Sequence, residues 1–238
     1  MRFIIGRNLS YSAAVLAAAT TFCLELPTAS ADGYTLTFEG MGPRRFIDWT
    51  FNSVSDTARG GIFNWEEGVK TFCTQLQEDL VQGGSVDYTI VEVEFVPDEP
   101  PLPGPMGISR AIVLKDLYAR WYSTVMDKDG SEAKNYAAAF QMNIWEITHQ
   151  DGNDSTPETV LQSLNFNAGN ATFTSNSVVD VIANMMLNSL GEGGVFQPFD
   201  SLRGLTSELK QDQLIVIPGA SGLAFGMGLI GVRRRRRR

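Results

Sequence analysis

The residues best suited to chemistry in this 238-residue chain are two cysteines, Cys23 and Cys73, and a single histidine, His149. Cys23 lies in an N-terminal segment that we expect to be removed on export, so Cys73 is the one cysteine of the mature protein. One cysteine cannot form an internal disulfide. Its thiol is therefore buried and inert, paired with another chain, or used in a reaction, and burial is common for a free cysteine.

The N-terminus has the layout of an export signal. Arg2 and Arg7 precede an apolar run over residues 11–24, and the small residues 29–31 follow at the positions that a signal peptidase reads. This order is typical of a secretory signal peptide, which we expect to cover residues 1–31. A membrane-spanning anchor is the alternative, but the apolar run is short for the core of a bilayer.

The C-terminus combines an apolar, glycine-rich run over residues 214–232 with six arginines at 233–238. A helix of about 20 apolar residues spans a bilayer, and the arginines would hold its end in the cytoplasm. A buried strand with a basic tail is the alternative. The order of Ile-Pro-Gly, apolar run and arginines resembles the PEP-CTERM type of bacterial sorting tail, although residues 216–219 stand where that family has Pro-Glu-Pro. The resemblance implies export and attachment to the bacterial membrane through residues 214–238.

The charge of the chain excludes one large class of function. The net charge is −8, and residues 32–217 carry 11 basic and 26 acidic side chains. Such a surface repels phosphate backbones, so we expect no nucleic-acid partner. The 43% of hydrophobic residues is ample for a packed core, and the length between the two ends fits one domain, which we place at residues 32–213.

The hydrophobic pattern predicts strands first and helices later. Alternating apolar residues or β-branched and aromatic residues indicate strands over 34–38, 45–52, 61–66, 69–76 and 86–96, followed by a proline-rich connector at 97–105. Helical spacing indicates helices capped by Ser109 and Ser131 and a third over 178–190 with Ser177 and Asp180 at its start, while 165–174 resembles a short strand or hairpin. We expect an α+β fold, with β-barrel- or sandwich-like strands first and helices inserted late.

Two short segments carry the most specific signal. One is Thr-Phe-Cys-Thr-Gln-Leu over residues 71–76, and the other is Ala-Phe-Gln-Met-Asn-Ile-Trp-Glu-Ile over residues 139–147. Together they resemble the thioester domains of bacterial surface proteins, in which a cysteine and a later glutamine condense within the folded domain. The resemblance implies that Cys73 is the thiol and Gln141 the acyl donor. It also implies that Ile144 and Trp145 are the packing pair, and we expect Phe72 and Phe140 to help to bury the bond.

Such a bond has clear physical requirements. A carboxamide is a poor electrophile, and sulfur attacks as the thiolate. The Gln141 carbonyl therefore needs hydrogen-bond donors aimed at the developing oxyanion, and the two groups must be held in near contact. Ammonia then leaves and a thioester remains. An amine or hydroxyl of a target later attacks the thioester, which frees Cys73 and leaves the target bound through an amide or ester.

The remaining candidates for chemistry are few. His149 follows Gln141 by eight residues, so it could share a helix face with it and act as a proton relay, although interaction with the end of the helix is the commoner role. The sequence has no P-loop, zinc-ligand set or Ser-His-Asp spacing, so we predict no metal or cofactor.

The predicted function is that of an exported cell-surface or matrix protein, anchored to the membrane at least transiently. Its partner would be a surface or matrix macromolecule that bears amines or hydroxyls, captured covalently through Cys73 and Gln141. A bond that is used once makes the protein a crosslinker and not an enzyme. The alternative is a non-covalent binding or matrix protein of the same fold in which no thioester forms; a secreted hydrolase has the least support.

Overall fold

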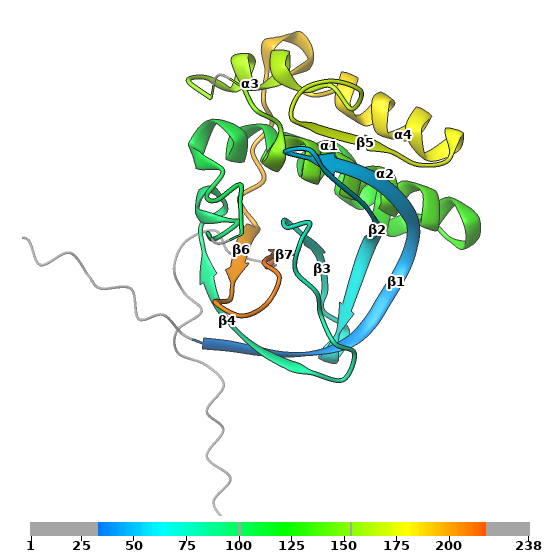
Figure 1. Cartoon of the computed structure of the whole chain (residues 1–238), viewed down its shortest axis with the longest axis vertical. Coiled ribbons are helices and arrows are strands. Elements are labelled where there is room, and N and C mark those ends of the chain that lie inside the picture. The colour runs from blue at the N-terminus through cyan, green and yellow to red at the C-terminus, as the bar shows by residue number, and fades with distance from the viewer. Residues whose placement is uncertain (1–32, 100, 153, 218–238) are drawn as a thin grey trace, which may run out of the picture. The chain divides into compact units, whose positions relative to one another are not determined.

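The computed structural model describes residues 33–99, 101–152 and 154–217, and these form an antiparallel seven-stranded sheet together with helices (Figure 1). The strands are β1 (Gly33–Phe51), β2 (Val54–Trp65), β3 (Lys70–Cys73), β4 (Ser85–Val91), β5 (Ala171–Thr174), β6 (Leu202–Thr206) and β7 (Gln213–Val216). The helices are α1 (Gly107–Asp127), α2 (Gly130–His149), α3 (Pro157–Ser163) and α4 (Ser177–Asn188). The predicted α+β class, with strands before helices, is confirmed.

The strand pairings close on themselves. β2 pairs with β3, then β7, β6, β4 and β1 follow in order, and β1 pairs back onto β2. β1 makes this closure possible because it is long: its first residues pair with β4, and its later residues pair with β2 on one edge and with β5 on the other. The segments predicted separately at 34–38 and 45–52 are therefore parts of one continuous strand.

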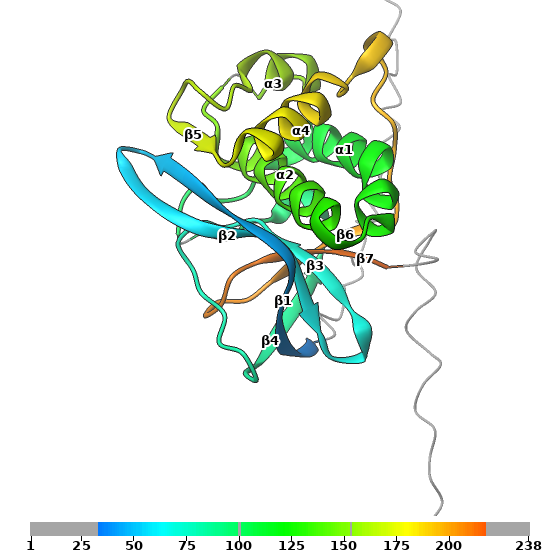
Figure 2. The same cartoon turned by 90° about the vertical axis from the view of Figure 1, so that its right-hand side faces the viewer.

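Helix α2 is the centre of the helical layer. It packs against α1, α4, β1 and β2, and Figure 2 shows it between the sheet and the other helices. Every residue from Ala137 to Gln150 is buried. A helix that is buried all round is enclosed by the fold, and its polar residues must find partners inside the protein. The polar side chains of α2 are therefore the first to consider for a role beyond packing.

The predicted helix caps are wrong at three starts. α1 and α2 begin before Ser109 and Ser131, at Gly107 and Gly130, whose positive φ angles of +74° and +53° suit glycine. Both serines therefore lie inside the first turn.

The start of α4 is also capped by a different residue from the one predicted. The cap is Asn176, whose side-chain oxygen accepts the N–H groups of Val178 and Val179 at 3.1 and 3.2 Å. Ser177 is the first helical residue, and Asp180 instead accepts the N–H of Ser175 at 2.8 Å. Asparagine is as good a cap as serine, so the spacing of types alone did not separate the two positions.

Several predicted boundaries also change. The strand predicted over 61–66 begins at Val54, and the strand predicted over 69–76 ends at Cys73. The strand predicted to reach residue 96 ends at Val91, and Val93–Phe95 forms a short 3-10 helix that buries Val93. At the other end of the chain, residues 214–216 belong to β7 and not to a C-terminal apolar segment, because Leu214 and Ile215 are buried between β3 and β6.

The two predicted terminal sorting signals lie largely outside the described residues. Residues 1–31 and 218–238, on which the export and anchoring predictions depend, lie outside the described residues. In the part of the chain that is described, no helix is both long and apolar enough to cross a membrane.

Candidate functional site

Cys73 and Gln141 lie side by side in the interior. Cys73 is the last residue of β3, Gln141 is in the middle of α2, and their side chains are 1% and 0% exposed. The Cys73 N–H donates to Oε1 of Gln141 at 3.3 Å, and Nε2 of Gln141 donates to the Cys73 carbonyl at 2.7 Å. The side-chain amide of Gln141 is thus held, by both of its ends, against the residue that carries the thiol.

The sheet leaves room for this contact. β2 pairs with β3 only at Thr71 and Lys70, so its pairing stops before Cys73. Because a buried main-chain donor and acceptor need partners, the amide of Gln141 takes the place that a residue of a neighbouring strand would have. The sequence positions 68 residues apart are therefore joined by a two-point contact that resembles strand pairing.

A glycine in β2 gives Gln141 its space. A Cβ placed on Gly60 would lie 3.2 Å from Cγ of Gln141 and 2.2 Å from Cδ1 of Ile47. Any side chain at residue 60 would therefore displace Ile47 and press on the stem of Gln141. The sequence analysis missed this residue, because a glycine inside a strand pattern does not say which neighbour comes close to it.

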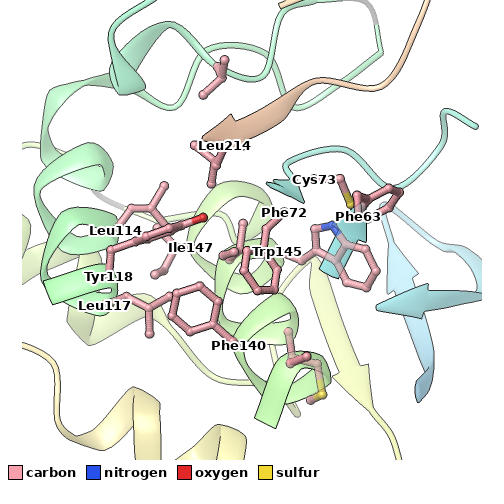
Figure 3. Close-up of a cluster of buried hydrophobic side chains, with 14 of the residues drawn as sticks. Phe63, Phe72, Cys73, Leu114, Leu117, Tyr118, Phe140, Trp145, Ile147 and Leu214 are labelled. Carbon is pink, nitrogen blue, oxygen red and sulfur yellow. The ribbon is translucent and has the colours of Figure 1, made fainter. Parts of the chain in front are cut away.

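Aromatic side chains enclose the site, as Figure 3 shows. The rings of Phe72 and Phe140 lie 4.9 Å apart, and the Trp145 indole stacks on Phe173 at 6.2 Å. The residues predicted to pack around the bond, namely Phe72, Phe140, Ile144 and Trp145, are all at most 1% exposed. Ring packing of this kind excludes water from the thiol and the amide.

The Trp145 indole has a second property. Its nitrogen points toward Cys73 in Figure 3, and it has no nitrogen or oxygen partner among the described residues although it is buried. Burial raises the pKa of the Cys73 thiol to about 12, while the side chain of Trp145 and the backbone N–H groups of Cys73 and Gln75 act in the opposite direction. The thiol is therefore neutral in the folded protein, and the groups around its sulfur are donors.

A cleft of about 1050 Å³ leads to this place from outside. Cys73 and Trp145 line it, together with parts of β1 and β2 and residues 75–80 of the loop that follows β3. Gln141 does not line the cleft. A molecule that enters the cleft would therefore meet Cys73 and Trp145 before Gln141.

Polar side chains hold the strands on the other side of Cys73. The indole N–H of Trp65 donates to Thr71 at 2.7 Å, and the Thr71 hydroxyl donates to Gln213 at 2.8 Å. The amide of Gln211 donates to the Gln75 carbonyl at 2.9 Å. Gln211 and Gln213 belong to a polar triplet just before the buried Leu214. The position of polar residues directly beside a buried apolar run is the sequence signal that indicated these two glutamines.

A buried carboxyl fixes the loop after Cys73. The carboxyl of Asp212 accepts hydrogen bonds from the N–H groups of Asp98 and Ser207 at 2.5 and 3.0 Å. The main-chain N–H of Asp212 donates to Oε1 of Gln75. Burial raises the pKa of Asp212 to about 7, and the two N–H donors oppose this rise. These bonds connect Asp212 to Gln75, near the start of residues 74–98, and to Asp98 at their end. They therefore help to position the loop that forms one wall of the cleft.

His149 occupies a different environment. Its Nδ1 lies 2.8 Å from the Thr148 hydroxyl and 3.1 Å from the Trp145 carbonyl, and its ring meets Phe51 edge-on at 4.9 Å. Burial lowers the pKa of His149 to about 3. It lines a second cavity of about 320 Å³ whose walls include neither Cys73 nor Gln141. The structure therefore gives the predicted relay no contact with either group.

The arrangement combines four elements that acyl chemistry needs. The Gln141 amide contacts the main chain of the residue that carries the thiol, an N–H is directed at the amide oxygen, buried aromatic side chains surround both residues, and Cys73 lines a cleft. No group of three His, Cys, Asp or Glu side chains able to hold a metal ion occurs within the described ranges. Searches with protein-family models, curated proteins and solved structures give no match to this chain.

Proposed function

We propose that this chain is an exported surface protein in which Cys73 and Gln141 condense to an internal thioester that captures a target covalently. The observation that carries the proposal is the two-point contact between the Gln141 amide and the Cys73 main chain in the buried interior. A glutamine that served packing alone would not need to meet the single free cysteine of the described chain.

The condensation needs no outside reagent. Sulfur of Cys73 attacks the side-chain carbonyl carbon of Gln141, a carbon–sulfur bond forms, the carbon–nitrogen bond breaks, and the thiol proton leaves with the nitrogen as ammonia. The Cys73 N–H, 3.3 Å from Oε1, donates to the oxygen on which negative charge develops. The 2.7 Å bond from Nε2 to the Cys73 carbonyl holds the departing nitrogen until it leaves. Fixed contact replaces a bimolecular encounter, which is the larger part of the advantage.

In the capture step, the sulfur of Cys73 is the leaving group and no longer the nucleophile. An amine or hydroxyl that enters the cleft attacks the acyl carbon of residue 141, and Cys73 leaves as sulfur that must take up negative charge or a proton. Because burial holds the pKa of this thiol near 12, a bare thiolate is a poor leaving group here. The unpartnered N–H of Trp145 is directed at that sulfur and stabilises it as it leaves.

The product stays bound to the protein, so each molecule reacts once. This is the behaviour of an adhesin or crosslinker on a cell surface or in a matrix. The export signal over residues 1–31 and the attachment tail, which we place after the end of β7 at Val216, give the reaction its place outside the cell.

Intact-mass measurement of the purified protein tests the proposal. The chain is expected to lack the mass of one ammonia, and treatment with methylamine is expected to add one methylamine and expose one thiol. The same measurement on Cys73→Ala should show the unmodified mass before and after methylamine. An unmodified mass for the native chain, with Cys73 free to react with an alkylating reagent after unfolding, contradicts the proposal.

The size of the cleft favours a second function, non-covalent binding by the same fold. A volume of about 1050 Å³ is at the upper end for a ligand pocket. In that case Cys73→Ala leaves target binding unchanged, and a denaturing wash removes the target from the native chain and from the variant. Loss of the retained target in that variant favours covalent capture.

A further inference from the structure

The cleft that leads to Cys73 carries an acidic side chain without a partner. Glu78 lies five residues after Cys73 in the loop that forms one wall, and it lines the cleft. Its Oε2 is buried, and within the described ranges the residue makes neither a hydrogen bond nor an ion pair. A partly buried carboxylate without a partner is costly, so a ligand with a positive charge would stabilise it.

Glu78 belongs to the same electrostatic neighbourhood as the reactive thiol. Burial is the main cause that raises the pKa of Tyr88, and Asp212, Cys73 and Glu78 raise it further. Burial raises the pKa of Glu78, and Lys210 is the one basic group that opposes this rise. Glu78 and Cys73 line the same cleft, and Lys210 does not form an ion pair with Glu78.

The other charges of the cleft do not offset this. Its lining residues with charge are Glu39, Arg44, Asp56, Arg59, Glu78 and Asp79. The two arginines are occupied: Arg44 donates to the carbonyls of Met41 and Gly42, and Arg59 lies over the Phe46 ring. The cleft therefore presents excess negative charge to an entering molecule.

We infer that the cleft selects a primary alkylammonium group and that Glu78 receives it and takes its proton before it attacks the acyl carbon. The inference rests on the proposed thioester and narrows its targets from amines or hydroxyls to amines. A hydroxyl has no charge for Glu78 to bind, so it gains nothing from this carboxylate on entry.

The ammonium gives one proton to the Glu78 carboxylate and becomes a neutral amine, whose nitrogen attacks the acyl carbon of residue 141. The carbon–nitrogen bond forms, the carbon–sulfur bond breaks, and the second proton of the nitrogen goes to the Cys73 sulfur. Glu78 then returns its proton to solvent.

Rates of thiol release test the inference. Methylamine is an ammonium at neutral pH and hydroxylamine is not charged, so the variant Glu78→Gln should react with methylamine about tenfold or more slowly while its rate with hydroxylamine stays within about twofold of the native rate. Glu67→Gln removes an exposed carboxylate that does not line the cleft and is the matched control, with both rates unchanged. Glu78→Asp keeps the charge on a shorter side chain and should retain a larger part of the methylamine rate than Glu78→Gln.

Each failure has its own signature. A native chain that has not lost ammonia overturns the proposed thioester. A native chain that has lost ammonia, with equal methylamine rates in the native chain and in Glu78→Gln, overturns the role of Glu78 alone. Equal slowing with methylamine and hydroxylamine makes Glu78 a structural residue and also overturns it. A diamine and an end-blocked peptide with one lysine distinguish the source of the ammonium. Faster reaction of the diamine identifies the target as a free amine, and faster reaction of the peptide identifies it as a protein side chain.

Discussion

Helix α2 presents two buried glutamines that have opposite surroundings. Gln150, at the C-terminal cap of the helix, is saturated: its amide nitrogen lies within 3.4 Å of oxygens on Glu146, Asn165, Ala168 and Ala171. Gln141, more than two turns earlier, has its amide bound only to the main chain of Cys73. Both are at most 1% exposed.

The difference separates a structural amide from a reactive one. Gln150 joins the end of α2 to the loop before β5, away from the free cysteine of the described residues, and its contacts are those of a satisfied buried group. Gln141 meets the one free cysteine of the described residues, beside an indole N–H without an oxygen or nitrogen partner and at the end of a cleft. Burial of a glutamine alone therefore does not indicate a reactive site. The groups that are buried beside its amide do.

The largest expected effect comes from exchanging the two glutamines for alanine. Gln141→Ala should show the full unmodified mass, because no acyl donor remains. Gln150→Ala should keep the loss of ammonia but lower the free energy of unfolding by about 1–3 kcal/mol, because buried carbonyls lose their donor. Intact mass and urea unfolding measure both. Loss of ammonia in Gln141→Ala would show that another residue is the acyl donor.

Removal of the indole N–H tests how the sulfur leaves. Trp145→Phe keeps an aromatic ring, and we expect it to release thiol on methylamine treatment roughly tenfold more slowly, because the leaving sulfur loses its donor. Phe173→Leu is the control, since it removes the stacking partner of Trp145 and keeps the N–H. Equal slowing in both variants would assign the effect to packing.

The space beside Gln141 can be tested at Gly60. Gly60→Ala should lower the free energy of unfolding by about 1–3 kcal/mol, because the new Cβ overlaps Cδ1 of Ile47. Ile47→Val removes that atom, and we expect the double variant to regain part of the stability while the 3.2 Å approach to Gln141 still reduces thioester yield. Gly33→Ala, with no atom within 4 Å of its Cβ, is the control in β1.

The structural end of α2 has a predicted pH dependence. Burial raises the pKa of Glu146 from 4.5 to about 7, so the folded state binds a proton that the unfolded state releases between these values. The stability from this group is present below about pH 4.5 and is lost as the pH rises toward 7. Relative to Glu146→Gln, the native chain should lose about 3 kcal/mol over this range, measured by urea unfolding. A constant difference between the two chains would contradict it.

Some features of the site and of the fold can be predicted from the sequence, and others cannot. The contact of Cys73 with Gln141 was predictable because the two segments resemble a motif pair, and the aromatic shell was predictable because large rings next to a thiol are buried together. The order of strands and helices followed from hydrophobic periods of two and 3.6 residues. These are local signals that a single chain carries.

The parts that sequence reasoning missed depend on contacts between distant residues. The apolar residues of β7 continue without a break into the C-terminal apolar run, so periodicity could not separate a buried strand from a membrane anchor. The roles of Gly60 and Glu78 depend on the closure of the sheet, which brings β2 and the loop after β3 around Gln141 and Cys73.

A crystal structure of the untreated protein at a resolution that separates individual atoms tests the central claim most directly. We expect continuous electron density from Sγ of Cys73 to the side-chain carbonyl carbon of residue 141, no nitrogen on that carbon, and the carbonyl oxygen still accepting the Cys73 N–H. An intact amide that keeps both of its hydrogen bonds to Cys73, beside a separate thiol, would contradict the claim.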